Sequence, residues 1–182
     1  MKNITRLAIM GLLAVMFTGC YKQTRLEQMG TSAQFKVIGL DDPVPSPDEA
    51  DLIVTTHIKK ASYLLKPRTA DMPYTFMIFI DGQKFAEDVK GVEEVESDMK
   101  EEKGKGIHFA LEKRFRLKPG FHELAVKTDY GKSPKVRIEF IGGRIHALKF
   151  EPVYGPRKVG LKKAFQQGLV DYKVYLDGSE IP

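Results

Sequence analysis

The sequence contains one cysteine and no tryptophan among its 182 residues. A single cysteine excludes a disulfide within the chain, so the fold must be stabilised by a hydrophobic core. The most apolar run, residues 7–17, has about 11 residues, whereas a membrane-spanning helix needs roughly 20. This run therefore has the length of an export-signal core and is too short to cross a bilayer.

Signatures of common catalytic sites are missing as well. None of Ser62, Ser97 and Ser133 lies in a Gly-x-Ser-x-Gly setting, so a hydrolase elbow is absent. No glycine-rich loop follows a strand and opens a helix, as a phosphate-binding loop would. The acidic pairs Glu93-Glu94 and Glu101-Glu102 fall in a highly charged segment, where solvation explains them better than a glycosidase site does. We therefore expect neither enzymatic activity nor a cofactor.

The four histidines share no spacing that would build a metal site from one element. They are His57, His108, His122 and His146. Two of them could meet across strands, but histidines with ordinary core or cross-strand partners are the simpler explanation, and Glu139 is a plausible partner for His146. The sequence therefore predicts no metal site.

The N-terminus has the organisation of an export signal, in which Lys2 and Arg6 precede the apolar run. The run ends in Phe17-Thr18-Gly19-Cys20, which resembles the lipobox of bacterial lipoproteins, with phenylalanine in place of the usual leucine. The resemblance implies that the Cys20 thiolate takes up a diacylglyceryl group and becomes residue one after cleavage. Several acyl chains together would anchor the protein stably. A secreted protein with one free thiol is the alternative.

These boundaries predict a signal peptide at 1–19, a lipidated tether at 20–33 and a single domain at 34–182. The chain from Cys20 onward is long enough for one domain with a real core. Removal of residues 1–19 leaves 27 basic and 24 acidic residues, a net charge of +3. This mild excess, together with export, argues against a nucleic-acid partner, which would require a concentrated basic face.

Strands are the main prediction for the rest of the chain, because alternating and β-branched or aromatic segments dominate it. Residues 52–56 and 74–80 are two such segments, and the second should be a central strand covered on both faces. Asp81-Gly82 suits a hairpin turn that leads into a returning strand at 83–85. Near the C-terminus, residues 172–176 form a last strand before a second Asp-Gly pair, at 177–178.

A second hairpin is predicted in residues 135–150, turning at Gly142-Gly143. It would pair Ile141 with Arg144, Phe140 with Ile145, Ile138 with Ala147 and Glu139 with His146. A third segment, 108–131, turns at Pro119-Gly120. Direct pairing of its flanks would set Phe115 opposite Leu124, Leu117 opposite His122, Arg116 opposite Glu123 and Glu112 opposite Lys127. A Pro-Gly turn of type I or II splays a two-residue hairpin, so this turn could instead carry the chain between two sheets.

Three other segments complete the expected organisation. The proline-rich stretch 41–50 is a loop, and the charged stretch 87–106 is a solvated loop that could hold a short helix. Apolar residues with helical spacing favour a short helix near 159–169.

Residues 117–126, LKPGFHELAV, followed by Tyr130-Gly131, resemble PEGA and related transthyretin-like domains of bacterial envelope proteins. The resemblance implies a mainly β fold, an antiparallel sandwich of immunoglobulin or transthyretin type, used as a surface-layer, wall-associated or adaptor module without catalysis. The charged segment 87–106 and the strands after residue 135 depart from that pattern.

Binding surfaces are less defined. A sugar could stack on tyrosines, although tyrosines at the edge of the core are more common; those concerned are Tyr63, Tyr130, Tyr154 and Tyr175. A basic cluster could meet lipid headgroups or an acidic wall polymer, although a solvated face is simpler; its members are Arg157, Lys158, Lys162 and Lys163.

The sequence thus predicts a non-catalytic, lipid-anchored envelope protein that acts as a structural or adaptor module. The alternative is a lipoprotein that binds a glycan or a small molecule. Its partners would be the membrane, through Cys20, and an envelope protein or cell-wall component. Tyr21, in place of an aspartate, resembles the pattern of lipoproteins sorted to the outer membrane, facing the periplasm.

Overall fold

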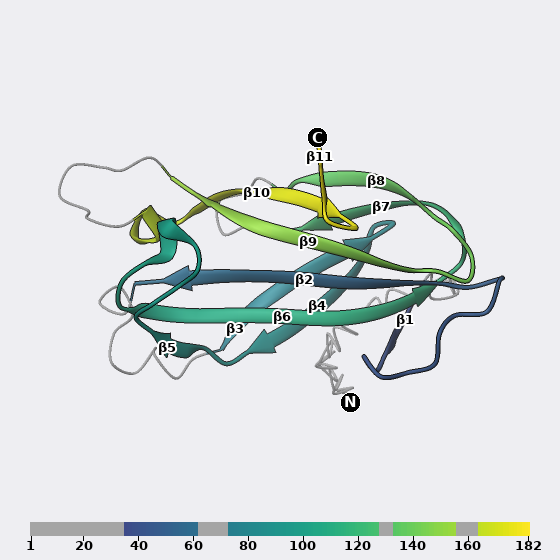
Figure 1. The fold of residues 1–182 in the computed structure, drawn as a ribbon, viewed down its shortest axis with the longest axis horizontal. Helices are drawn as coiled ribbons and strands as arrows, with labels where there is room; N and C mark the ends of the chain where they lie inside the picture. The colour runs from purple at the N-terminus through teal and green to yellow at the C-terminus, as the bar shows by residue number, and fades with distance from the viewer. Residues whose placement is uncertain (1–34, 62–72, 128–132, 156–163) are drawn as a thin grey trace, which may run out of the picture. The chain divides into compact units, whose positions relative to one another are not determined.

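Two β-sheets pack face to face in this computed structural model, which describes residues 35–61, 73–127, 133–155 and 164–182 (Figure 1). The larger sheet contains β1 (Phe35–Ile38), β2 (Ala50–Lys60), β5 (Val92–Glu94), β6 (Gly106–Leu117), β9 (Ile145–Tyr154), β10 (Leu169–Leu176) and β11 (Ser179–Ile181). The smaller sheet contains β3 (Tyr74–Ile80), β4 (Gln83–Val89), β7 (Gly120–Val126) and β8 (Lys135–Phe140). Two 3-10 helices, η1 (Lys100–Glu102) and η2 (Ala164–Gln167), lie in the connections.

The strand order is β1-β6-β2-β9-β10-β11 in the larger sheet, where β5 also pairs with β6, and β4-β3-β7-β8 in the smaller sheet. All pairs of described strands are antiparallel except β2 and β9, which run parallel. The predicted mainly β sandwich is confirmed, with this one parallel pair inside it. In place of the helix expected near 159–169, the described residues hold the single turn η2, and residues 156–163 lie outside them. No helix among the described residues is long and apolar enough to span a bilayer.

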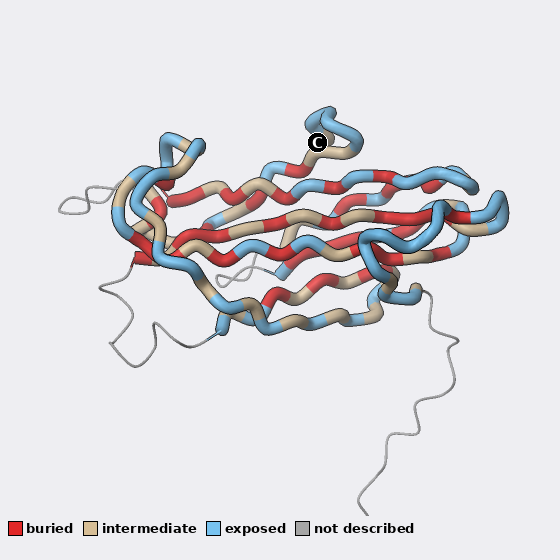
Figure 2. The backbone as a smooth tube through the Cα atoms, turned by 60° about the horizontal axis from the view of Figure 1, so that its bottom comes forward, coloured by how far each residue is buried: buried red, intermediate tan, exposed pale blue. Residues whose placement is uncertain are grey.

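The core lies between the sheets, and along the strands that bound it buried residues alternate with less buried ones (Figure 2). On β2 the core residues include Leu52, Val54 and Ile58, on β6 Phe109, Leu111 and Phe115, and on β3 Phe76, Ile78 and Ile80, all of them buried. β3 is an interior strand of its sheet, as predicted, but it is fully buried on one face only, since Thr75 on the other face is exposed. Residues of opposite parity on β2 and β6 therefore face away from the core.

The predicted Asp81-Gly82 hairpin is confirmed. Ile80 pairs with Gln83, and both turn residues have positive φ, 49° at Asp81 and 79° at Gly82. Asp177 and Gly178 repeat this geometry between β10 and β11, with φ of 48° and 85°. Aspartate and glycine tolerate this left-handed region better than other residues do, so the local sequence alone determines both turns.

The turn predicted at Gly142-Gly143 is present, since the Arg144 amide donates to the carbonyl of Ile141 at 3.3 Å, but the predicted hairpin is wrong because β8 and β9 do not pair with each other. β8 pairs with β7 in the smaller sheet, whereas β9 pairs with β2 and β10 in the larger one. The two glycines instead let the chain cross between the sheets while the 46–49 loop packs against them. The Gly143 amide donates to the carbonyls of Ser46 (3.1 Å) and Glu49 (2.8 Å).

Direct pairing across Pro119-Gly120 is also wrong, and the alternative, a turn between two sheets, is right. Phe115 on β6 pairs with Leu52 in the larger sheet, while Leu124 on β7 pairs with Val136 in the smaller one. Gly120 has a φ of 128°, which a residue with a side chain rarely adopts. Polar and apolar residues alternate along both β6 and β7, because each strand has one face on the core. This shared alternation produces the matches of charge and of apolar residues that suggested a hairpin.

Candidate functional site

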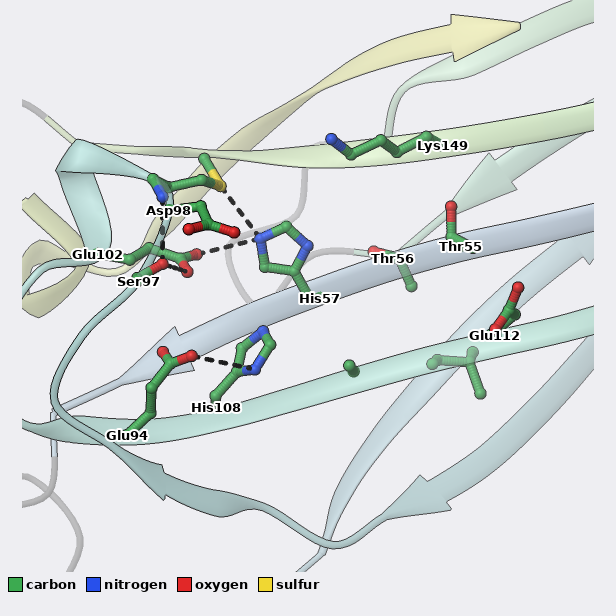
Figure 3. A pocket seen from close by; sticks show the side chains of 13 residues that line it. Thr55, Thr56, His57, Glu94, Ser97, Asp98, Glu102, His108, Glu112 and Lys149 are labelled. Atoms are coloured by element: carbon green, nitrogen blue, oxygen red, sulfur yellow. Dashed lines mark hydrogen bonds and ion pairs between the residues drawn. The ribbon is translucent and has the colours of Figure 1, made fainter. Parts of the chain in front are cut away.

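A cavity of about 610 Å³ opens on the outer face of the larger sheet, near the end of β2 and the start of β6 (Figure 3). Two strands form its floor, and the segment that runs from β5 through η1 forms its wall. Its polar lining includes His57, Glu94, Ser97, Asp98, Glu102, His108 and Lys149, beside the thioether of Met99.

Strand pairing brings two histidines together on the floor. Lys59 pairs with His108 and His57 with Ala110, so the histidines are diagonal neighbours on adjacent antiparallel strands. Their ring centroids are 5.2 Å apart, in an edge-to-face arrangement. The sequence analysis left open that two histidines could meet across strands, and strand pairing brings His57 and His108 together in this way.

The wall buries an acidic residue that the sequence analysis expected to be solvated. The Gly104 amide donates to the carbonyl of Val95 at 2.8 Å and closes the segment into a compact loop, and the Glu102 amide donates to the carbonyl of Met99 at 3.0 Å. The Glu102 side chain is only 1% exposed. A charged segment predicts solvent exposure, and no local pattern signals that one of its carboxylates will turn inward.

Glu102 is held ionised by hydrogen bonds. Tyr154 donates to its Oε1 at 2.5 Å, Ser97 donates to its Oε2 at 3.2 Å, and His57 Nε2 lies 3.3 Å from Oε1. Burial alone would raise the pKa of Glu102, but the hydrogen bonds with His57 and Tyr154 hold it below its ordinary value. Burial and the nearby charge of Glu102 raise the pKa of Tyr154, so the phenol keeps its proton and donates.

His108 is held in the opposite, neutral state. Burial lowers the pKa of its ring, although the charge of Glu94 opposes the shift. Within the described part of the chain, neither ring nitrogen of His108 has a hydrogen-bond partner, and the nearest carboxylate oxygen, on Glu94, is 3.9 Å from Nδ1. The buried Lys59 ammonium already pairs with that glutamate at 2.8 Å. A neutral imidazole without a partner is able to accept a ligand in the cavity.

His57, Glu102 and His108 each offer one ligand atom, and these atoms all lie within 4.8 Å of one another. Two imidazole nitrogens and a carboxylate oxygen form a donor set that suits Zn²⁺ and neighbouring transition metals. The lowered pKa values of Glu102 and His108 favour the ionised carboxylate and the neutral imidazole that coordination requires.

No family model, curated protein or solved structure matches this chain significantly. The site therefore has to be interpreted from its own geometry.

The other two histidines lie away from the cavity, in matching structural roles. His122 Nδ1 is 2.5 Å from Asp81 Oδ2, and His146 Nδ1 is 3.1 Å from Asp177 Oδ2. Both aspartates belong to the Asp-Gly turns. The predicted partner of His146, Glu139, is wrong because it lies on β8 in the other sheet. These two histidines tie the hairpin turns to neighbouring strands.

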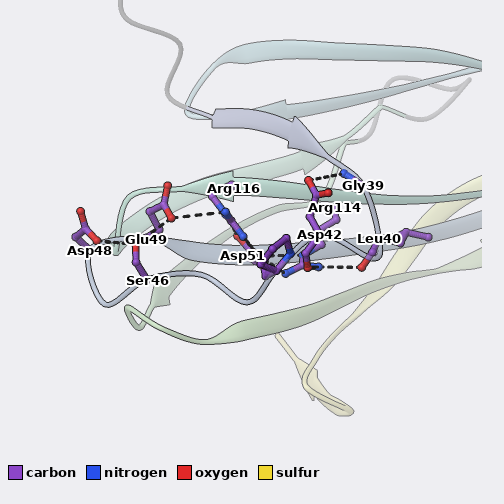
Figure 4. A network of polar contacts seen from close by, with 10 residues as sticks. Gly39, Leu40, Asp42, Ser46, Asp48, Glu49, Asp51, Arg114 and Arg116 are labelled. Carbon is purple, nitrogen blue, oxygen red and sulfur yellow. Dashed lines mark hydrogen bonds and ion pairs between the residues drawn. The ribbon is translucent and has the colours of Figure 1, made fainter.

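A second polar cluster occupies the opposite end of the same outer face (Figure 4). Asp51 on β2 accepts hydrogen bonds from Arg114 and Arg116 on β6. Arg114 also donates to the carbonyls of Leu40, Asp42 and Pro43. All five donors of the Arg114 guanidinium are thereby used, so this residue fastens the 39–43 loop to the sheet.

The remaining residues singled out from the sequence do not form a site among the described residues. Cys20, with the whole predicted signal peptide and tether up to residue 33, lies outside them, as do the basic cluster at 157–163 and the tyrosines at 63 and 130. Tyr154 is buried under the cavity and Tyr175 is half-buried on β10. The predicted aromatic platform therefore has no support in the described part of the chain.

Proposed function

We propose that this chain is a non-catalytic, lipid-anchored envelope protein whose β-sandwich binds a transition metal ion through His57, Glu102 and His108. The observation that carries the proposal is the convergence of two histidines and one buried carboxylate on a cavity, with His108 left without a hydrogen-bond partner among the described residues. This favours the ligand-binding alternative of the sequence analysis and makes the small ligand a metal ion.

An alternative explanation is a purely structural network. It accounts for Glu102, which accepts hydrogen bonds from Tyr154 and Ser97. It does not account for the convergence of two histidines and a buried carboxylate on one cavity, with ligand atoms within 4.8 Å of one another. A bound cation would use the spare imidazole and offset the charge of Glu102.

Metal binding is tested by equilibrium dialysis of the full-length protein in detergent against Zn²⁺. We expect about one ion per chain, and we expect His108→Ala to weaken binding by at least about 100-fold, because loss of a direct ligand should exceed the 10–100-fold cost of losing an outer partner. Lys149→Ala is the matched control, since Lys149 lines the same cavity and its ammonium cannot coordinate. Equal binding by wild type and His108→Ala would refute the assignment.

The envelope location rests on the sequence alone. The apolar run at 7–17 and Phe17-Thr18-Gly19-Cys20 support export and lipidation, and Tyr21 supports sorting to the outer membrane. We expect Cys20→Ser to move the protein from the membrane fraction to the soluble fraction after cell lysis, because the only acylation site is lost. Retention of the serine variant in the membrane fraction would contradict lipid anchoring.

An adaptor function is the second candidate, and one feature of the larger sheet favours it. β2 pairs with one edge of β6 along residues 107–117, so β5 and β1 pair with the opposite edge, at 106–108 and 114–117. Between them, residues 109–113 meet no described strand on that edge, and an extended segment of an envelope protein could add there. If wild type binds no Zn²⁺, recovery of one envelope protein by cross-linking in cells would support this function instead.

A further inference from the structure

A thioether lies beside the three candidate ligands. Met99 Sδ is 3.1 Å from His57 Nε2, and Met99 precedes η1 in the wall of the cavity. Its backbone is held on both sides, because its amide donates to Ser97 Oγ at 3.3 Å and its carbonyl accepts from the Glu102 amide at 3.0 Å. The sulfur therefore has a defined position next to His57.

Packing does not explain this position. Met99 is only half-buried and belongs to neither hydrophobic cluster of the described residues. A methionine normally fills irregular gaps among apolar side chains, whereas this sulfur lies against the imidazole of His57. Its surroundings are those of a ligand atom.

Resting on the proposed function, we propose that Met99 is a further ligand at the His57–Glu102–His108 site and that it gives the site a preference for Cu⁺ over Zn²⁺. Thioether sulfur is a soft donor that selects Cu⁺, whereas carboxylate oxygen is a hard donor. Both oxygens of Glu102 already accept hydrogen bonds from hydroxyl groups. Met99 Sδ, which lies against His57 Nε2, therefore adds a soft donor beside the two histidines.

The test measures Cu⁺ and Zn²⁺ affinities separately, by competition with a chromogenic chelator, in ascorbate for Cu⁺. Every protein carries Cys20→Ser, which removes the only thiol in the chain. We expect Met99→Leu to weaken Cu⁺ binding by about tenfold or more and to change Zn²⁺ binding by less than about threefold. Met77→Leu is the matched control, a half-buried methionine on β3 in the other sheet. Copper X-ray absorption should show a sulfur neighbour that Met99→Leu removes.

Each outcome separates the two proposals. If the parent protein binds neither metal, the proposed function fails and this inference fails with it. If Zn²⁺ binds at His108 but Met99→Leu leaves Cu⁺ affinity and the absorption spectrum unchanged, the metal site stands and the role of Met99 is overturned. An equal loss of both metals in Met99→Leu, without loss of the sulfur signal, would make Met99 a structural residue of the wall.

Discussion

Replacing Asp51 with alanine is expected to lower the free energy of unfolding by about 3–5 kcal/mol, the range measured when one partner of a buried ion pair is removed. Asp51 is 0% exposed and Arg114 is 2% exposed. The variant leaves the Arg114 guanidinium with its three carbonyl contacts but without the carboxylate that balances its charge. Urea unfolding measures the effect, and Asp51→Asn should lose less because an acceptor oxygen remains.

Asp48→Ala is the matched control, because Asp48 is exposed and accepts a hydrogen bond from Ser46 in the adjoining loop. Its urea midpoint should stay close to that of wild type. A similarly small effect of Asp51→Ala would show that the loop carbonyls alone hold Arg114.

The same cluster determines how acid acts on the fold. Burial would raise the pKa of Asp51, but hydrogen bonds from Arg116 and Arg114 hold it below the ordinary value of 3.8. A carboxyl with a depressed pKa stabilises the folded state fully above 3.8 and loses that contribution as pH falls below it. The difference in stability between wild type and Asp51→Asn should therefore shrink in strong acid.

The second large effect is expected at Gly142. Replacing it with alanine should lower the free energy of unfolding by about 3 kcal/mol, the upper end of the range for overpacking. An added methyl group would overlap the carbonyl oxygen of Pro47, a backbone atom that cannot rotate aside. Relief of that overlap requires the 46–49 loop to move, which would break the two hydrogen bonds donated by the Gly143 amide. Thermal unfolding would show a clearly lower melting temperature.

Gly178→Ala separates this steric cause from backbone strain. Gly178 has a φ of 85°, and no atom lies within 4 Å of the position that an added methyl group would take. Alanine there should lower the free energy of unfolding only by the cost of left-handed backbone, about 1–2 kcal/mol. Equal losses in the two variants would mean that Gly142 matters through its backbone freedom and not through the contact with Pro47.

The sequence predicted the local structure well because local structure depends on neighbouring residues. A continuous run of β-branched and aromatic residues located β3, and Asp81-Gly82 located the following turn together with its register. The same reasoning failed at Gly142-Gly143, because two glycines permit a tight hairpin and a crossing between sheets equally well. The packing of the 46–49 loop against them decides between the two.

The candidate site likewise depends on contacts between residues that are far apart in the sequence. Nothing in the spacing of His57 and His108 predicts a contact, which exists because β2 and β6 pair in one register. Nothing in the charged segment distinguishes Glu102 from its neighbours, and it is buried only because the loop closed by Gly104 folds over the sheet.

The sequence by itself therefore determined the β class, most strands and the two Asp-Gly turns, since side-chain alternation and φ preference are properties of adjacent residues. The prediction of export and lipidation also comes from the sequence alone, from residues 1–20. Only the tertiary structure decided which strands pair, which turns cross between the sheets and which polar side chains converge on a cavity. Those features depend on free energy gained when distant segments exclude water together, and that gain is not encoded at any single position.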